Sequence, residues 1–192
     1  IFEIKIGSGY KSGFFCDQRE NRQYLTNFVK GKSVLDLFSY TGGFGIYAKK
    51  YGASEVTSVD LDEYAVSQLK RNANLNGVRV NAVNSDAFIY MRQLIENKKE
   101  YDIVILDPNK VITSREAMEE GVIKYIDLNK LALRLVKDGG LFVSCSCSGL
   151  LSMDDFVSAL RRAASISKKV VKVFKKTGAS ADHPFMINYP EG

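Results

Sequence analysis

The sequence predicts an α/β fold with a doubly wound, mainly parallel sheet. Short apolar runs alternate along the chain with segments in which apolar residues recur every three or four positions. A glycine-rich turn follows the first of the long apolar runs, as in proteins that bind a nucleotide-type cofactor beyond the carboxyl ends of parallel strands. Because crossovers between parallel strands are right-handed, helices are expected on both faces of the sheet.

The elements are expected in the following order. A β-hairpin should open the chain, with its turn at Gly7-Ser8-Gly9. The spacing Asp17-Gln18-Arg19-Glu20 is typical of a capping box and predicts a helix to about Val29. Helices are further predicted after the glycine turn, around 65–76, at 87–96, at 122–136 and from Ser152. Strands are predicted at 34–38, 55–59, 78–83, 101–106, 141–145, 170–174 and 185–187, the last of them antiparallel.

Composition sets limits on the class of protein. The 192 residues fit one globular domain, with 45% hydrophobic and 26% charged residues. No apolar run approaches the roughly 18 residues of a membrane span. Three cysteines, two of them in Cys145-Ser146-Cys147, do not make a disulfide framework, which favours a reducing, cytoplasmic setting. One histidine and few cysteines argue against a closed zinc site, and the net charge of +5 permits an anionic partner without requiring one.

The glycine turn indicates the cofactor class. Val34–Phe38 is apolar except for Asp36, and Gly42, Gly43 and Gly45 then let the backbone turn tightly before a helix whose amides face the ligand. A G-x-G-x-x-G fingerprint is absent, which weakens a nicotinamide dehydrogenase interpretation. The arrangement Asp-x-Phe-x-x-x-Gly-Gly-x-Gly instead resembles motif I of class I S-adenosylmethionine (SAM) methyltransferases. A carboxylate near the loop suits the amino group and the sulfonium of SAM.

Four acids lie at or near predicted strand ends: Asp36, Asp60, Asp86 and Asp107. Asp60 is placed to accept hydrogen bonds from both ribose hydroxyls, Asp86 from the adenine amino group, and Asp36 from the methionine amine, directly or through water. Such residues also cap helices, which is the alternative for each of them. We predict that the cofactor contacts Asp36, Phe38, Ser39, Tyr40, Thr41, Gly42, Gly43, Asp60, Leu61, Asp86, Ala87 and Asp107.

Cys147 is the candidate nucleophile. It falls just past the predicted strand 141–145, on the ligand side, whereas Cys145 is expected to be a small buried hydrophobe within that strand. A thiolate there could add to C6 of a pyrimidine and make C5 nucleophilic enough to take a methyl group from SAM. A purely structural cysteine is the alternative.

Several motifs then occur together in order. They are Gly13-Phe14-Phe15-Cys16-Asp17-Gln18-Arg19-Glu20-Asn21-Arg22, the segment from Asp36 to Gly45, Asp107-Pro108, Cys145-Ser146-Cys147-Ser148-Gly149 and Asp182-His183-Pro184. This combination resembles the RlmI-type methyltransferases, which make 5-methylcytosine in large-subunit ribosomal RNA. The resemblance implies a sheet order of 3-2-1-4-5-7-6, SAM as the cofactor, Cys147 as nucleophile and Asp107 as a hydrogen-bonding partner of the target base.

The resemblance also implies a domain division. Residues 1–16 would be the β-hairpin remnant of a connecting segment and 17–192 the methyltransferase domain, without the family's N-terminal PUA domain. The chain departs from the family at Asp107-Pro108-Asn109-Lys110-Val111, where the usual pattern is Asp-Pro-Pro-Lys-Phe. An amino-group RNA methyltransferase and a non-catalytic SAM-binding or RNA-binding domain therefore stay open, as does assembly as a homodimer.

Ribosomal RNA is the expected partner. We predict substrate contacts by Arg19, Arg22, Lys110 and His183. The lysines of 168–176 have two interpretations: they track phosphates, or they protect an exposed edge strand from aggregation.

Overall fold

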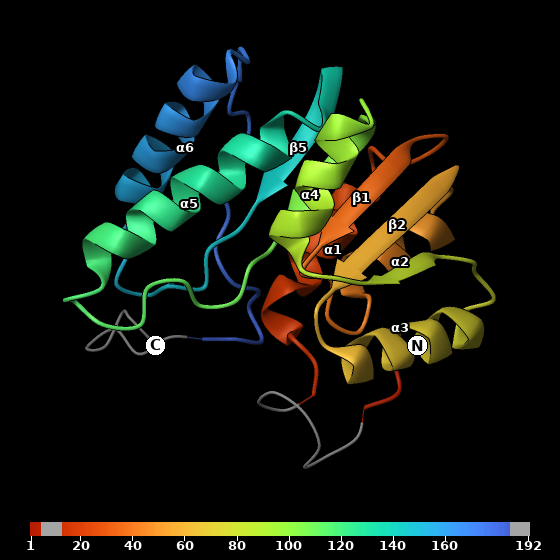
Figure 1. Ribbon diagram of the computed structural model, residues 1–192. Helices are drawn as coiled ribbons and strands as arrows, with labels where there is room; N and C mark the ends of the chain where they lie inside the picture. Colours follow the sequence, from red (N-terminus) through yellow and green to blue (C-terminus); the bar gives the residue numbers. More distant parts are fainter. Residues whose placement is uncertain (5–12, 185–192) are drawn as a thin grey trace.

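The structure, a computed structural model, describes residues 1–4 and 13–184. Its centre is a five-stranded parallel sheet with the order β3-β2-β1-β4-β5 (Figure 1). The strands are β1 (Ser33–Leu37), β2 (Glu55–Asp60), β3 (Asn81–Asn84), β4 (Tyr101–Leu106) and β5 (Val136–Ser144). The predicted doubly wound α/β class is confirmed, as is the order of the first five strands.

Helices separate the strands. They are α1 (Arg19–Leu25), α2 (Gly43–Lys50), α3 (Glu63–Leu75), α4 (Ala87–Glu96), α5 (Met118–Leu133) and α6 (Met153–Ser167), and a short 3-10 helix, η1 (Cys16–Gln18), precedes α1. The predicted buried face of α3 is confirmed, because Ala65, Leu69 and Ala73 are all almost inaccessible. Among the helices of the described residues, none has the length and apolar character that a membrane crossing needs.

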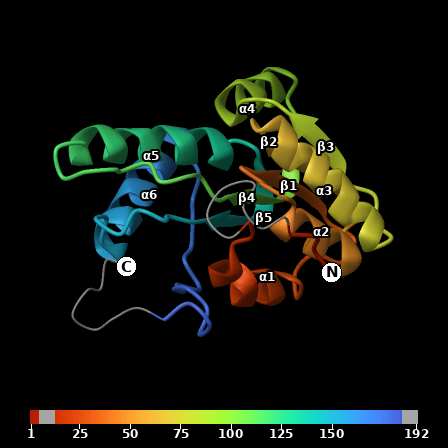
Figure 2. The same cartoon turned by 90° about the horizontal axis from the view of Figure 1, so that it is seen from below.

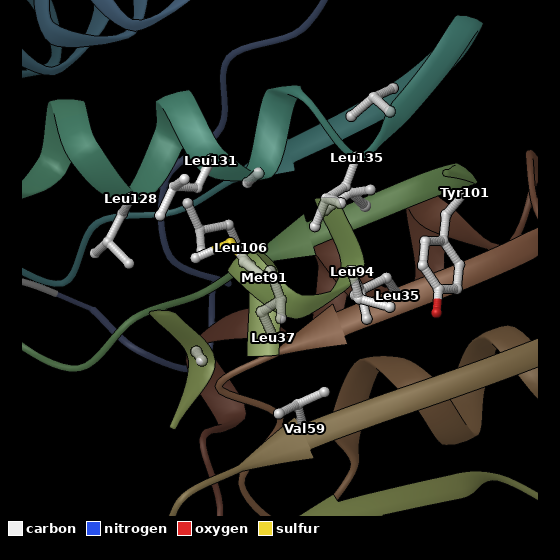
Figure 3. Close-up of a cluster of buried hydrophobic side chains, with 14 residues drawn as sticks. Leu35, Leu37, Val59, Met91, Leu94, Tyr101, Leu106, Leu128, Leu131 and Leu135 are labelled. Carbon is white, nitrogen blue, oxygen red and sulfur yellow. The ribbon is translucent and has the colours of Figure 1, made fainter. Parts of the chain in front are cut away.

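Helices cover both faces of the sheet (Figure 2). Successive side chains of a strand point to opposite faces, so Val34 packs toward α1 and α2 while Leu35 and Leu37 pack toward α4 and α5. Figure 3 shows the second of these clusters, in which Met91 of α4 and Leu128 of α5 lie over the strands. The burial of β1 on both faces explains why Val34, Leu35 and Leu37 are apolar, with the buried Asp36 as the exception.

Several predicted boundaries are wrong. The first helix ends at Leu25 rather than Val29, and its N-cap is Gln18 without a side-chain cap, because Asp17 belongs to η1 and does not start a capping box. The third strand begins at Asn81 rather than at residue 78. The helix predicted at 122–136 ends at Leu133.

The last strand before α6 also differs from the prediction. β5 starts at Val136, and Gly139 and Gly140 lie inside it rather than before it. Its pairing with β4 skips from Val136 to Leu141 while β4 advances only from Tyr101 to Ile103, so the glycines form an irregular loop-out. The strand ends at Ser144, which puts Cys145 just past the strand rather than within it.

The predicted strand 170–174 is not formed among the described residues, and Val170 is 96% exposed. This segment passes α1 and the turn that follows it. Lys175 lies 4.0 Å from the centre of the Tyr24 ring in α1, and Phe174 packs on Phe28, beyond the end of α1, at a centroid distance of 5.9 Å. The edge-strand interpretation of the nearby lysines is therefore wrong for this structure. The turn of the predicted N-terminal hairpin and the strand at 185–187 lie outside the described residues, and 1–4 and 13–15 contain no strand.

Candidate active site

Asp36 fixes the glycine turn to the sheet. Its Oδ2 accepts hydrogen bonds from the Gly45 amide at 2.9 Å and from the Ser58 hydroxyl at 3.2 Å. Burial raises the pKa of Asp36 to about 7, although both hydrogen bonds oppose the rise. With 1% of its surface exposed, the carboxyl group supports the turn from within the protein rather than lining an open pocket. The predicted contact with the methionine amine, directly or through water, stays a prediction.

Two of the glycines are required by neighbouring protein groups. A Cβ on Gly43 would lie 2.5 Å from Nη1 of Arg22, and one on Gly45 would lie 2.2 Å from Oγ of Ser58. Because these two residues lack a side chain, the N-terminus of α2 can approach Arg22 and Ser58 closely. This close approach lets the turn lie at the end of β1.

The loop between β1 and α2 holds an unusual backbone. Phe38 and Tyr40 both have left-handed conformations, with φ of 59° and 47°. Such conformations cost about 1–3 kcal/mol each in non-glycine residues and gather at ligand sites. Between them, the Ser39 hydroxyl is buried and has no hydrogen-bond partner among the described residues. An unpaired buried polar atom beside two strained residues indicates a place where a polar ligand group completes the site.

Asp60 holds the neighbouring edge of this loop. Its Oδ2 accepts from the Tyr40 amide at 2.7 Å and its Oδ1 from the Asp62 amide at 3.0 Å, and burial raises its pKa. The next residue, Leu61, is 68% exposed although it is apolar. A half-buried acid followed by an exposed leucine offers a polar group and an apolar surface side by side at the carboxyl end of β2.

Asp86 shows the capping role that was its alternative. Its Oδ1 accepts from the Ile89 amide at 3.0 Å, which makes it the N-cap of α4, and the following Ala87 is buried. Asp62 caps α3 in the same way by accepting from the Tyr64 amide at 2.9 Å. Asp60 is thus the acid that bonds to the loop between β1 and α2, whereas Asp62 bonds to α3.

Asp107 lies just beyond β4 and is half-buried. Its Oδ1 is 3.4 Å from Nε2 of Gln18, and the Cys145 thiol donates a hydrogen bond to its carboxyl group. Burial raises the pKa of Asp107 to about 6; the negative charge of Asp17 adds to this rise, and the positive charge of Arg22 opposes it. At pH 7 this carboxyl group is therefore mostly ionised, with about a tenth of it protonated.

The two cysteines beside Asp107 have different surroundings. Burial raises the pKa of the Cys145 thiol well above its ordinary value, so this sulfur stays protonated and bonded to Asp107. Cys147 is exposed, and its Sγ lies 3.6 Å from the carbonyl oxygen of Pro108. The structure thus brings Cys147 next to the Asp107-Pro108 segment, at the same end of the sheet as the glycine turn.

The predicted substrate residues do not share one environment. Arg22 is 3% exposed, and its guanidinium donates to the carbonyl oxygens of Gln18 and Phe15 and lies 4.5 Å from the centre of the Phe14 ring. Its predicted role on the RNA-facing surface is wrong for this structure, because the charge is enclosed behind the glycine turn. Burial lowers its pKa.

The other three predicted substrate residues are exposed. Arg19 forms an ion pair of 3.3 Å with Asp182, and the Ser180 hydroxyl and amide donate to the Asp17 carbonyl oxygen at 2.7 and 2.8 Å. These contacts bring the segment containing His183 to the start of α1. Lys110 lies three residues beyond Asp107.

Comparisons with known proteins agree with this geometry. Residues 1–178 match the family of S-adenosylmethionine-dependent methyltransferases. The chain belongs to that family. SAM is accordingly its cofactor.

Among curated proteins, this methyltransferase is 38% identical to the ribosomal RNA large subunit methyltransferase I of Aeromonas salmonicida, over 98% of this chain and 48% of the relative. It is 40% identical to the protein of the same name from Photobacterium profundum, over 98% of this chain and 48% of the relative. The chain thus spans about half the length of the curated relatives it matches.

Solved structures show the same fold. The crystal structure of SMU.776 complexed with SAH has a TM-score of 0.86 and 23% identity, over 99% of this chain and 50% of that one. The SAM-dependent methyltransferase from Agrobacterium tumefaciens has a TM-score of 0.70 and 22% identity, over 85% of this chain and 55% of that one.

The residues present fit the methyltransferase cofactor. SAM carries amine, carboxylate and ribose hydroxyl groups, and the loop offers the unpaired Ser39 hydroxyl and the Asp60 carboxylate to such groups. The exposed Leu61 offers an apolar surface for a flat base. Within the described residues, no cluster of histidine, cysteine and acidic side chains is arranged to hold a metal ion.

Sequence reasoning missed two sets of residues. Gln18, whose Nε2 lies 3.4 Å from Asp107 Oδ1, was named only within the capping-box and family motifs, and its separation of 89 positions from Asp107 gave no local signal. Tyr125, Ser146 and Ser148 form a hydroxyl cluster around the Cys147 segment, and the serines on both sides of Cys147 were the one available hint.

Proposed function

We propose that this protein transfers the methyl group of SAM to C5 of a cytosine in large-subunit ribosomal RNA through a covalent adduct with Cys147. The observation that carries the proposal is the pairing of an exposed thiol with a half-buried acid. Cys147 lies against Pro108, and the adjoining Asp107 has a pKa raised to about 6. The names of the most similar curated relatives support large-subunit ribosomal RNA as the substrate class, and a ribosomal substrate would place the protein in the cytoplasm.

SAM supplies an electrophilic methyl group in this chemistry. The Cys147 thiolate forms a bond to C6 of the cytosine, and the electron pair of the 5,6 double bond becomes available at C5 for the methyl group. A base or a water molecule then takes the C5 proton, the electron pair of the C5–H bond restores the 5,6 double bond, and the Cys147 thiolate leaves C6.

Asp107 is suited to help the addition step. Attack at C6 places negative charge toward N3 of the ring, and a protonated carboxyl group can donate a hydrogen bond there. Donors aimed at developing charge are often the largest catalytic contribution. The raised pKa of Asp107 supports this role, because about a tenth of the carboxyl group is protonated and able to donate at pH 7, far more than with an ordinary pKa.

The segment Asn109-Lys110-Val111, which departs from the family pattern, is still anchored to the rest of the protein. Val111 packs on apolar clusters from both sides, and the Ile112 amide donates to the Ser148 hydroxyl at 3.1 Å. This anchoring favours a catalytic protein over a non-catalytic domain. No aromatic residue follows Asp107-Pro108 to stack on a base, which argues against an amino-group methyltransferase.

The test is mass mapping of methylated nucleosides in large-subunit ribosomal RNA. RNA from cells that lack the gene is compared with RNA from cells that express the full-length protein or its Cys147→Ala variant. We expect one 5-methylcytosine that depends on the wild-type protein and is absent with the variant. Identical modification patterns in all three samples, or a new methyl group on a nitrogen, would contradict the proposal.

A further inference from the structure

A buried hydroxyl lies beneath the Cys147 segment. Tyr125 of α5 is fully buried, and its hydroxyl lies 2.7 Å from Oγ of Ser146 and 3.0 Å from Oγ of Ser148. These serines are the residues immediately before and after Cys147. Ser148 is buried, whereas Cys147 between them is exposed. The tyrosine therefore holds the chain on both sides of the thiol.

The hydroxyl of Ser148 also connects the Cys147 segment to the segment that follows Asp107. Ser148 Oγ accepts from the Ile112 amide at 3.1 Å, and the Ser148 amide lies 3.3 Å from Ser146 Oγ. Ser148 Oγ accepts from Ile112 with a lone pair and can donate its own hydrogen to the Tyr125 oxygen. Tyr125 can then donate to Ser146, and each hydroxyl of the cluster has a partner.

The tyrosine is itself held in place. Asn129, one turn further along α5, donates to the Tyr125 carbonyl oxygen at 2.7 Å and accepts from the Ser144 hydroxyl at 2.6 Å. The Tyr125 ring packs edge-on against Phe156 of α6 at a centroid distance of 5.5 Å. The hydroxyl is thus carried by a rigid helix that is bonded to the end of β5.

We propose that Tyr125 is a positioning residue for Cys147, which presents the thiol to the target base by fixing Ser146 and Ser148. This inference rests on the proposed function of Cys147 as the nucleophile. Covalent attack requires the reacting atoms in near-contact geometry, and a shift of about 1 Å can lower the rate about 100-fold. The hydroxyl cluster links the Cys147 segment to the segment after Asp107, and so fixes the position of the thiol relative to the carboxyl group.

The Tyr125→Phe variant tests this role because it removes one oxygen atom and retains the ring that packs on Phe156. Tyr101→Phe is the matched control. Tyr101 is also a buried tyrosine whose hydroxyl is hydrogen-bonded, to Thr57, but it begins β4 at the opposite end from Asp107 (Figure 3). Both variants lose one buried hydroxyl, so a general loss of stability should affect them alike.

The measurement is single-turnover kinetics with full-length protein, saturating SAM and large-subunit ribosomal RNA from cells lacking the gene. We expect Tyr125→Phe to lower the methylation rate at least 10-fold while the dissociation constants of SAM and RNA stay within about twofold of wild type. Tyr101→Phe should keep the wild-type rate. The double variant Tyr125→Phe/Ser146→Ala should lower the methylation rate by a smaller factor than the product of the two single-variant factors, because both residues act in one cluster.

A wild-type rate in Tyr125→Phe would overturn the inference, as would an equal loss of rate in Tyr101→Phe or fully multiplicative effects in the double variant. Each of these results leaves the proposed function standing. A wild-type protein that neither methylates the RNA nor forms an adduct would overturn the proposed function, and this inference with it.

Discussion

At the scale of single residues, the acids at the strand ends divide into two roles that their sequence context did not separate. Asp36 and Asp86 each accept a hydrogen bond from an amide in the first turn of a helix, Gly45 of α2 and Ile89 of α4. Asp60 and Asp107 lie at the ends of β2 and β4, beside strained or exposed groups. Of these four acids only Asp36 is fully buried, so the two roles depend not on burial alone but on bonding contacts that no local pattern records.

Asp60 is the residue for which a cofactor effect is easiest to measure. Replacing it with alanine should weaken SAM binding by about 1.5–3 kcal/mol, the range for losing hydrogen bonds to a charged group. Isothermal titration calorimetry gives this difference directly. Asp62→Ala is the matched control, since it removes the N-cap of α3 and should cost about 1 kcal/mol of stability with little change in SAM affinity. An unchanged dissociation constant for Asp60→Ala would refute its assignment to the cofactor.

At the scale of elements, strands that are buried on both faces were predictable because their sequences are nearly continuous apolar runs, as in β1 and β4. The start of β5 was not predictable, because Gly139 and Gly140 are typical of a helix end. The irregular loop that contains these glycines depends on the pairing of β5 with β4. The segment 170–174 has the residue pattern of a strand, but a strand also needs a hydrogen-bonded neighbour. In the described residues Phe174 instead packs on Phe28, just beyond α1.

The turn between β1 and α2 gives the prediction at this scale. Gly43→Ala should destabilise the protein by about 1–3 kcal/mol, because its Cβ would meet the Arg22 guanidinium, which is enclosed and bonded to two carbonyl oxygens. Urea unfolding measures the loss. Gly178→Ala, whose Cβ would meet nothing within 4 Å, should change stability by less than about 0.5 kcal/mol. Equal stability of the two variants would show that Arg22 does not pack against the turn as described.

At the scale of the whole molecule, the active site joins segments that are far apart in the chain. The α1 region meets Asp107 through Gln18 and meets the 180–183 segment through Ser180, at sequence separations of 89 and 163 residues. The sequence predicted that Asp107 and Cys147 share one edge of the sheet, since the ends of adjacent parallel strands meet there. It could not predict which side chains would surround them, because those arrive through long-range packing.

The central claim is that Cys147 attacks the target cytosine, and its most direct test is covalent capture. RNA carrying 5-fluorocytosine at the target cannot lose the C5 substituent as a proton, so the adduct should accumulate with the full-length protein and SAM. Peptide mass spectrometry should place the bonded nucleotide on Cys147. Cys147→Ala should abolish the adduct, whereas Cys145→Ala should still form it on Cys147. An adduct on Cys145, or its formation by Cys147→Ala, would contradict the account.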